Sequence, residues 1–281
     1  MAETLLVEAR HGRFFVLKND NRVSLSMAVY GEWTESEFAL LRQVLRPGDT
    51  VVDVGANLGC LTVPLAGAVG LQGMVVALEP QPEIFRLLAT NTVINGLDNV
   101  RLFHAAAGAA PGTLPVAELR FDQPRNYGAL SMGDLGREAG RGDGDRREVA
   151  LVRLDDILAG RPVRLIKIDV EGMESDVLAG AGETIRQHRP FLFIENEIPG
   201  EASQRLIALV QSLGYLLYWQ MAPQYVADNF KSVKENIFGS DICINMFCVP
   251  EELGVNVNGM VQITGADQHP RNAQGLPGNA S

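Results

Sequence analysis

Cysteines, basic residues and long apolar runs are scarce in this sequence, and each shortage excludes a class of protein. Three cysteines in 281 residues cannot crosslink a secreted domain of this size. Only Cys243 and Cys248 lie close together, and no histidine or third cysteine accompanies them, so no structural zinc site is predicted. No window approaches about eighteen uninterrupted apolar residues, so no membrane span is expected.

The shortage of basic residues argues against a nucleic-acid partner. Twenty-four lysines and arginines stand against thirty-four acidic residues, which gives a formal net charge of −10. Proteins that bind DNA or RNA neutralise phosphates with basic side chains. The N-terminus, MAETLLVEARHGRFF, has no basic region followed by a long apolar run, so no signal peptide is expected. We therefore expect a cytoplasmic location.

Apolar side chains, in contrast, are plentiful enough to bury a core. Hydrophobic residues make up 46% of the chain and charged residues 21%, which excludes a disordered chain. The motifs HExxH, GxSxG and paired CxxC are absent, so zinc proteases, serine hydrolases and zinc ribbons are not supported.

The first part of the chain, residues 1–48, is predicted to form a hairpin and a lid helix. Residues 13–30 alternate weakly in polarity around Asn19-Asp20-Asn21, which indicates two short strands and a turn. Thr34 followed by Glu37 is typical of a capping box, which predicts a helix that ends at Pro47-Gly48.

From residue 49 to 261 the pattern predicts a single domain with a doubly wound parallel sheet. Short apolar runs alternate with helical segments, as in βαβ units. The predicted strands include TVVDVG, MVVALEP, NVRLFHAAAG, VRLIKIDV, PFLFIENE, YLLYWQ and INMFCVPEE. Residues 109–149 interrupt the alternation as an insertion with an exposed flexible loop, and residues 262–281 are predicted to be a disordered tail.

The turn after the first strand of this alternation is rich in glycine and follows an acid. Asp53 precedes Gly55 by two residues, and Gly59 follows four residues later. This spacing does not match the G-x-G-x-x-G dinucleotide motif, and the lysine of a P-loop is missing. An acid there would repel a pyrophosphate but suits a cationic, phosphate-free cofactor, which indicates S-adenosylmethionine.

A second acid, Glu79, ends the next strand of the sheet. A carboxylate at this position can accept both hydroxyls of a ribose. Small residues at 105–108, which include Ala106, could leave space for a flat ring. For each acid alone, the alternative role is that of a helix cap or a solvated turn residue.

A third polar cluster ends the strand VRLIKIDV and is followed by another at the next strand. Lys167, Asp169 and Glu171 would lie beside the reacting group, although a structural Lys–Asp pair with a helix cap from Glu171 is the alternative. Glu195 and Asn196 end the neighbouring strand. With Asp169 they offer oxygen atoms suited to Mg²⁺, which would lower the pKa of a bound hydroxyl.

Three runs in this order resemble the FkbM family of S-adenosylmethionine-dependent methyltransferases. They are WTESEFALLRQVLRPGDTVVDVGANLGCLTVPLA, ALEPQPEIFRLLATNTVINGL and LIKIDVEGMESDVLAGAG, and they cover roughly residues 34 to 200. The resemblance implies a class I methyltransferase fold, with a seven-stranded sheet and the last strand antiparallel. It also implies methylation of a hydroxyl on a sugar, a polyketide or a similar small metabolite.

Residue roles follow from these clusters and from the resemblance. The expected cofactor contacts are Asp53, Gly55, Ala56, Asn57, Gly59, Glu79, Pro80 and Ala106. The expected catalytic residues are Lys167, Asp169 and Glu171, and the candidate Mg²⁺ ligands are Asp169, Glu195 and Asn196. Two alternatives stay open at this point, namely a dehydrogenase on the same fold and a non-catalytic nucleoside-binding protein. The sequence leaves the oligomeric state open, with a homo-oligomer among the states it allows.

Overall fold

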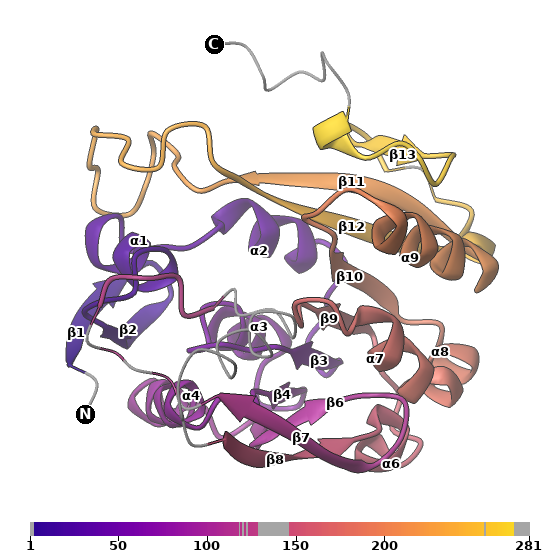
Figure 1. Ribbon diagram of the computed structural model, residues 1–281, viewed down its shortest axis with the longest axis horizontal. Helices are drawn as coiled ribbons and strands as arrows, with labels where there is room; N and C mark the ends of the chain where they lie inside the picture. Colours follow the sequence, from indigo (N-terminus) through magenta and orange to yellow (C-terminus); the bar gives the residue numbers. More distant parts are fainter. Residues whose placement is uncertain are drawn as a thin grey trace.

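An eight-stranded sheet forms the centre of the computed structural model, which describes residues 3–117, 119, 121, 123–128, 146–255 and 257–272 (Figure 1). Across the sheet the strands are β13 (Val261–Ile263), β11 (Tyr215–Pro223), β12 (Ile242–Pro250), β10 (Phe191–Glu195), β9 (Leu165–Ile168), β3 (Thr50–Val54), β4 (Met74–Leu78) and β5 (Val100–Phe103). The five strands from β10 to β5 are parallel. Strand β12 is antiparallel to both of its neighbours, β10 and β11.

This order confirms the predicted class I methyltransferase architecture, with one difference in the number of strands. The antiparallel strand β12 lies between β10 and β11, as expected for the last of seven strands. The eighth strand, β13, pairs with the outer edge of β11 and was not predicted. It covers a sheet edge that would otherwise expose unpaired backbone groups.

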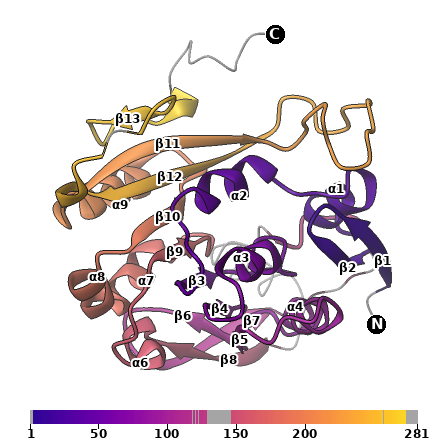
Figure 2. The same cartoon turned by 180° about the vertical axis from the view of Figure 1, so that it is seen from behind.

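Helices cover both faces of the sheet. One face carries α6 (Leu154–Leu158), α7 (Glu174–Gly180), α8 (Gly182–His188) and α9 (Glu201–Ser212). The other carries α2 (Glu35–Arg42), α3 (Thr62–Val69) and α4 (Pro82–Ile94), and Figure 2 shows α2 next to α3 and beneath β11 and β12. Side chains alternate between the faces, so Val52 and Val54 point to the first and Val51 and Asp53 to the second.

The N-terminal hairpin lies earlier in the chain than predicted. It consists of β1 (Thr4–Ala9) and β2 (Gly12–Leu17), and the predicted second strand is the helix α1 (Val23–Val29). The turn residues at 19–21 start this helix instead of a hairpin. The carboxylate of Asp20 accepts hydrogen bonds from the backbone N–H groups of Arg22 and Ser24, at 3.1 and 2.7 Å. Such a side chain satisfies free N–H donors at a helix start.

The third predicted strand is broken after Phe103. Its second half, β6 (Ala105–Ala107), leaves the main sheet and pairs with β8 (Arg146–Val152), which in turn pairs with β7 (Gly112–Ala117). The insertion predicted at 109–149 thus contributes two strands of a small sheet. The predicted flexible loop falls mostly on residues 129–145, which lie outside the described part of the chain.

The C-terminal segment has defined secondary structure up to residue 272, beyond the start of the predicted disordered tail at residue 262. After the 3₁₀ turn η1 (Glu251–Leu253) come β13 and a second 3₁₀ turn, η2 (Pro270–Asn272). The indole N–H of Trp219 donates to the carbonyl of Gln268 at 2.7 Å, which fixes this segment to β11. Among the described residues, no helix has the length and apolar character that a membrane crossing requires.

Candidate active site

The glycine turn after β3 borders a cleft at the carboxyl ends of the parallel strands. Gly55 has φ +77, and a Cβ there would lie 1.7 Å from the backbone carbonyl oxygen of Asp169, so only glycine fits. The N–H groups of Gly55 and Ala56 both donate to the carbonyl of Leu78, at 3.0 and 2.9 Å. These contacts hold the backbone of the turn between the ends of β4 and β9.

Glu79 enters this cleft directly after β4 and is only 6% exposed. One carboxylate oxygen accepts the backbone N–H of Asn57 at 3.0 Å, and the other accepts that of Gln81 at 2.8 Å. Burial raises the pKa of Glu79 to about 7. The carboxyl group is therefore fixed in place and can titrate near neutral pH.

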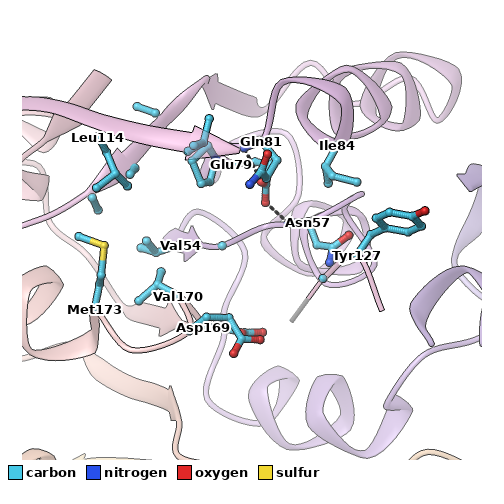
Figure 3. Close-up of a pocket in the computed structure, with 18 residues that line it drawn as sticks. Val54, Asn57, Glu79, Gln81, Ile84, Leu114, Tyr127, Asp169, Val170 and Met173 are labelled. Carbon is cyan, nitrogen blue, oxygen red and sulfur yellow. Dashed lines mark hydrogen bonds between the residues drawn. The ribbon is translucent and has the colours of Figure 1, made fainter. Parts of the chain in front are cut away.

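The cleft encloses about 790 Å³ of free space, including its open mouth. Figure 3 shows the carboxyl groups of Glu79 and Asp169 entering the same space from the ends of two strands. Small and apolar residues form much of the wall, among them Ile84, Ala105, Ala106, Ala107, Leu114, Val116 and Met173. The charged lining residues that the structure describes are all acidic, namely Glu79, Asp169 and Glu171. The cleft therefore suits a ligand with an apolar portion and positive or neutral charge.

Five of the eight predicted cofactor residues line this cleft: Gly55, Asn57, Glu79, Pro80 and Ala106. Ala56 and Gly59 do not line it. Ala56 is buried in the core on the α2 and α3 side, and a Cβ on Gly59 would lie 3.0 Å from Leu88 of α4. Because Ala56 and Gly59 are small, the chain can pack closely beneath the turn.

Asp53, the third predicted cofactor residue that does not line the cleft, is fully buried below the turn. Its carboxylate accepts the hydroxyl of Thr62 at 2.6 Å and lies 3.2 Å from the ammonium group of Lys167. Alternation along β3 explains this position, because Asp53 points towards α3 and away from the strand end. A direct contact between Asp53 and a cofactor is therefore not supported.

Lys167 likewise lies beneath the cleft and does not line it, contrary to the predicted catalytic contact. It is 5% exposed. Burial disfavours its charge, but the carboxylates of Asp53 and Asp169 outweigh that effect and raise the pKa of Lys167. The side chain is thus a buried cation, and the sequence-based alternative of a structural Lys–Asp pair describes its surroundings better.

A carboxylate rim formed by Asp169, Glu171 and Glu195 lies on the far side of the cleft, where Asp169 and Glu171 line the cleft and Glu195 lies behind them. One carboxylate oxygen from each residue lies within 4.8 Å of the others. Burial raises the pKa of Glu195 well above its ordinary value, and repulsion from Asp169 and Glu171 adds to this shift. Glu195 is therefore harder to ionise than an ordinary carboxyl group, whereas the Asp169 side chain is 41% exposed to the cleft and solvent.

Asn196, the third predicted Mg²⁺ ligand, directs its side-chain amide at another group. Consecutive residues of an extended chain point to opposite sides, and Asn196 follows Glu195. Its side-chain amide lies 3.3 Å from the sulfur of Met246 and is buried away from the cleft. Glu171, a predicted catalytic residue, lies close enough to Asp169 and Glu195 to complete a trio of carboxylates.

Glu37 of α2 is a buried acid near this rim that the sequence did not identify as part of the site. It is 6% exposed, and its carboxylate accepts the side-chain N–H of Asn245 at 3.2 Å. Burial raises its pKa to about 7, and repulsion from Asp169 adds to the shift. The predicted capping box is not formed, because Thr34 makes no side-chain cap and has φ 42. Glu37 instead turns inward and contacts Asn245 of β12, a residue far away in the sequence.

Tyr127 and Gly128 also line the cleft and come from the insertion. A Cβ on Gly128 would lie 2.6 Å from the side-chain nitrogen of Asn57, so this segment approaches the glycine turn closely. Arg125, two residues before Tyr127, pairs with Asp20 through a β-bridge. The N-terminal part thereby holds this segment next to the glycine turn at one side of the cleft.

Comparison with known proteins points to one family. A sequence model described as "Methyltransferase FkbM domain" matches residues 53–217. The chain is 26% identical over 208 residues to methyltransferase sdnD of Sordaria araneosa, covering 65% of this chain and 79% of that protein. It is 29% identical over 213 residues to the 31-O-demethyl-FK506 methyltransferase FkbM of Streptomyces tacrolimicus, covering 67% of this chain and 81% of that protein.

Among solved structures, the chain is similar to methyltransferase FkbM from Methylobacillus flagellatus KT. The sequence identity is 19% and the TM-score 0.43, with 75% of this chain and 50% of that chain covered.

Proposed function

The chain belongs to the FkbM methyltransferase family, and we propose that it methylates a hydroxyl oxygen of a small molecule, such as a sugar or a polyketide. The family match makes it an S-adenosylmethionine-dependent methyltransferase. The choice of oxygen as acceptor draws support from the relative named for 31-O-demethyl-FK506. The observation that carries the proposal is a cleft with Glu79 at one side and Asp169 at the other.

The lining residues fit S-adenosylmethionine, which carries an ammonium and a sulfonium but no phosphate. Glu79 would accept the ribose hydroxyls, since its two oxygens are already held by backbone donors. The small side chains at 105–107 would border the adenine. The acidic lining suits the two positive charges and would repel the pyrophosphate of NAD. The dehydrogenase alternative is therefore disfavoured.

S-adenosylmethionine, when bound, supplies an electrophilic methyl group, so the protein's main task is to position two reactants. A neutral alcohol is a weak nucleophile, and Asp169 would take its proton as general base. Burial and acidic neighbours raise the pKa of Glu195 and make it harder to ionise than an ordinary carboxyl group. Asp169 lines the cleft with a side chain that is 41% exposed, which favours it as the proton acceptor on this side, and Glu171 is the second carboxylate of the rim that lines the cleft.

Release of S-adenosylhomocysteine from a panel of small molecules tests this function. The panel should pair each alcohol with the corresponding amine, so that the acceptor atom is identified. Methylation of alcohols alone supports the proposal, and methylation of amines alone contradicts it. Protein that binds S-adenosylmethionine yet methylates nothing on a broad panel would favour the non-catalytic nucleoside-binding alternative.

A metal-assisted version of the same reaction is a second candidate. The carboxylates of Asp169, Glu171 and Glu195 lie within 4.8 Å of one another and provide oxygen ligands of the kind that Mg²⁺ prefers. Dialysis against EDTA separates the two versions. If Asp169 acts without a metal, turnover remains unchanged after dialysis. A loss of turnover that added Mg²⁺ restores would support the metal-assisted version.

A further inference from the structure

The ammonium group of Lys167 contacts both sides of the cleft from below. It donates a hydrogen bond to the carbonyl of Gly55 at 2.7 Å, and it lies 3.2 Å from the Asp53 carboxylate and 3.4 Å from the Asp169 carboxylate. Strand register explains the first two contacts, because Lys167 of β9 is the direct neighbour of Asp53 on β3. An ammonium has three donors, and this one has three oxygen neighbours.

Two of these neighbours belong to opposite sides of the active site. Gly55 lies in the turn of the cofactor side, and Asp169 carries the carboxylate of the acceptor side. The two residues also touch directly, since a Cβ on Gly55 would collide with the carbonyl of Asp169. The backbone N–H of Asp169 donates to Val54 at 3.0 Å. Lys167 therefore connects the turn and the catalytic carboxylate where they already meet.

A simple ion pair with Asp53 does not account for this arrangement. The shortest contact of the ammonium is to Gly55 and not to Asp53. The Asp53 oxygen nearest the ammonium has no hydrogen bond of good geometry, while its other oxygen already accepts the Thr62 hydroxyl. The lysine is thus directed at the turn, with Asp53 as a nearby counter-charge.

We propose that Lys167 is a positioning residue that holds the cofactor turn in register with the Asp169 carboxylate. The proposal rests on the function proposed above, since it assumes that the turn borders S-adenosylmethionine and that Asp169 faces the sulfonium. The sequence predicts a cofactor contact for Asp53 and a catalytic role for Lys167. The proposal replaces both with one indirect role for Lys167. Lys167 acts through Gly55 and Asp169, and Asp53 keeps the buried cation neutralised.

Two binding properties distinguish the role of Lys167 from that of Asp169, namely the affinity for both compounds and the preference for S-adenosylmethionine over S-adenosylhomocysteine. The turn contacts cofactor and product alike, so it affects the affinity for both S-adenosylmethionine and S-adenosylhomocysteine. The Asp169 carboxylate attracts only the positive sulfonium, so it affects the preference for S-adenosylmethionine over the neutral product. Loss of Lys167 should therefore reduce both properties, whereas loss of the Asp169 charge should reduce the preference alone.

Calorimetric titration of both compounds into four proteins tests this. Lys167→Met alone would leave Asp53 buried and unpaired and could unfold the chain, so the test uses Asp53→Asn/Lys167→Met, which removes both charges. The matched control is Glu3→Gln/Lys18→Met, which removes an exposed ion pair of 2.6 Å. Asp169→Asn and the unmodified protein complete the set, and thermal unfolding shows whether each variant folds.

The buried double variant should bind S-adenosylhomocysteine about tenfold more weakly, which corresponds to one charge-assisted hydrogen bond, and should lose the preference for S-adenosylmethionine. Asp169→Asn should lose only the preference, and the surface control should lose neither. A folded double variant with unchanged product affinity would overturn the proposal. So would a double variant without a folding transition, because the pair would then serve the fold itself. If the unmodified protein binds neither compound, the proposed function fails instead.

Discussion

The two sides of the cleft are built in different ways. The proposed cofactor side consists of a turn and an acid that follow β3 and β4 directly, and backbone hydrogen bonds fix Glu79 through Asn57 and Gln81. The proposed acceptor side combines Asp169 and Glu171, which follow β9, with Glu195 at the end of β10, and Glu37 of α2 lies near them. Local backbone geometry thus forms the first side, and long-range packing forms the second. We expect substitutions on the two sides to affect different measured quantities.

The largest expected effect belongs to the acceptor side. Asp169→Asn removes the proposed general base and should lower kcat by about 10²–10⁴-fold, the range typical of such groups. The assay follows release of S-adenosylhomocysteine with an alcohol that the unmodified protein methylates. Asp98→Asn, an exposed acid elsewhere on the surface, is the control and should keep normal turnover. Normal turnover in Asp169→Asn would remove Asp169 from the mechanism.

The next effect belongs to the cofactor side. Glu79→Ala removes the proposed acceptor of the ribose hydroxyls and should weaken cofactor binding by about 10- to 100-fold in calorimetry. Glu83→Ala is a suitable control, because Glu83 lies in the first turn of α4 and does not line the cleft. Unchanged affinity in Glu79→Ala would contradict the assignment of the ribose to this carboxylate.

A smaller effect should appear as a pH dependence of cofactor affinity. The pKa of Glu79 is raised to about 7, and the ionised form is the better acceptor for two hydroxyls. Affinity should therefore rise by about tenfold between pH 6 and pH 8, as one pH unit on either side of this pKa allows. The Glu79→Gln variant should show no such change. An equal pH dependence in that variant would assign the titration to another group.

The raised pKa of Glu79 has the opposite effect on the stability of the cofactor-free protein, which should fall as the pH rises. The folded-state pKa of Glu79 lies above its ordinary value of 4.5, so the folded state binds a proton more tightly than the unfolded state does. Its contribution to stability is fully present below about pH 4.5 and is lost as the pH rises towards 7. Glu37 shifts in the same direction and adds to this loss.

The contrast between the two sides also explains what the sequence could predict. The doubly wound sheet followed from the alternation of strands and helices, its antiparallel last strand from the family resemblance, and Gly55 and Glu79 from their places at strand ends. Strand alternation, applied strictly, would have separated Glu195 from Asn196 and moved Asp53 off the cleft. Glu37 could not be predicted, because only packing of α2 against β12 turns it inward. Residues 19–21 are predicted to form a hairpin turn but precede α1, because turn residues can start either a helix or a hairpin.

The division between the two sides can be tested directly by titrating S-adenosylhomocysteine into Asp169→Asn and Glu79→Ala in parallel. The product has no sulfonium charge, so Asp169 should not contribute to its binding. We predict that Asp169→Asn binds it with the affinity of the unmodified protein, and that Glu79→Ala binds it about 10- to 100-fold more weakly. An equal loss in both variants, or a loss confined to Asp169→Asn, would contradict the division of this cleft into a cofactor side and an acceptor side.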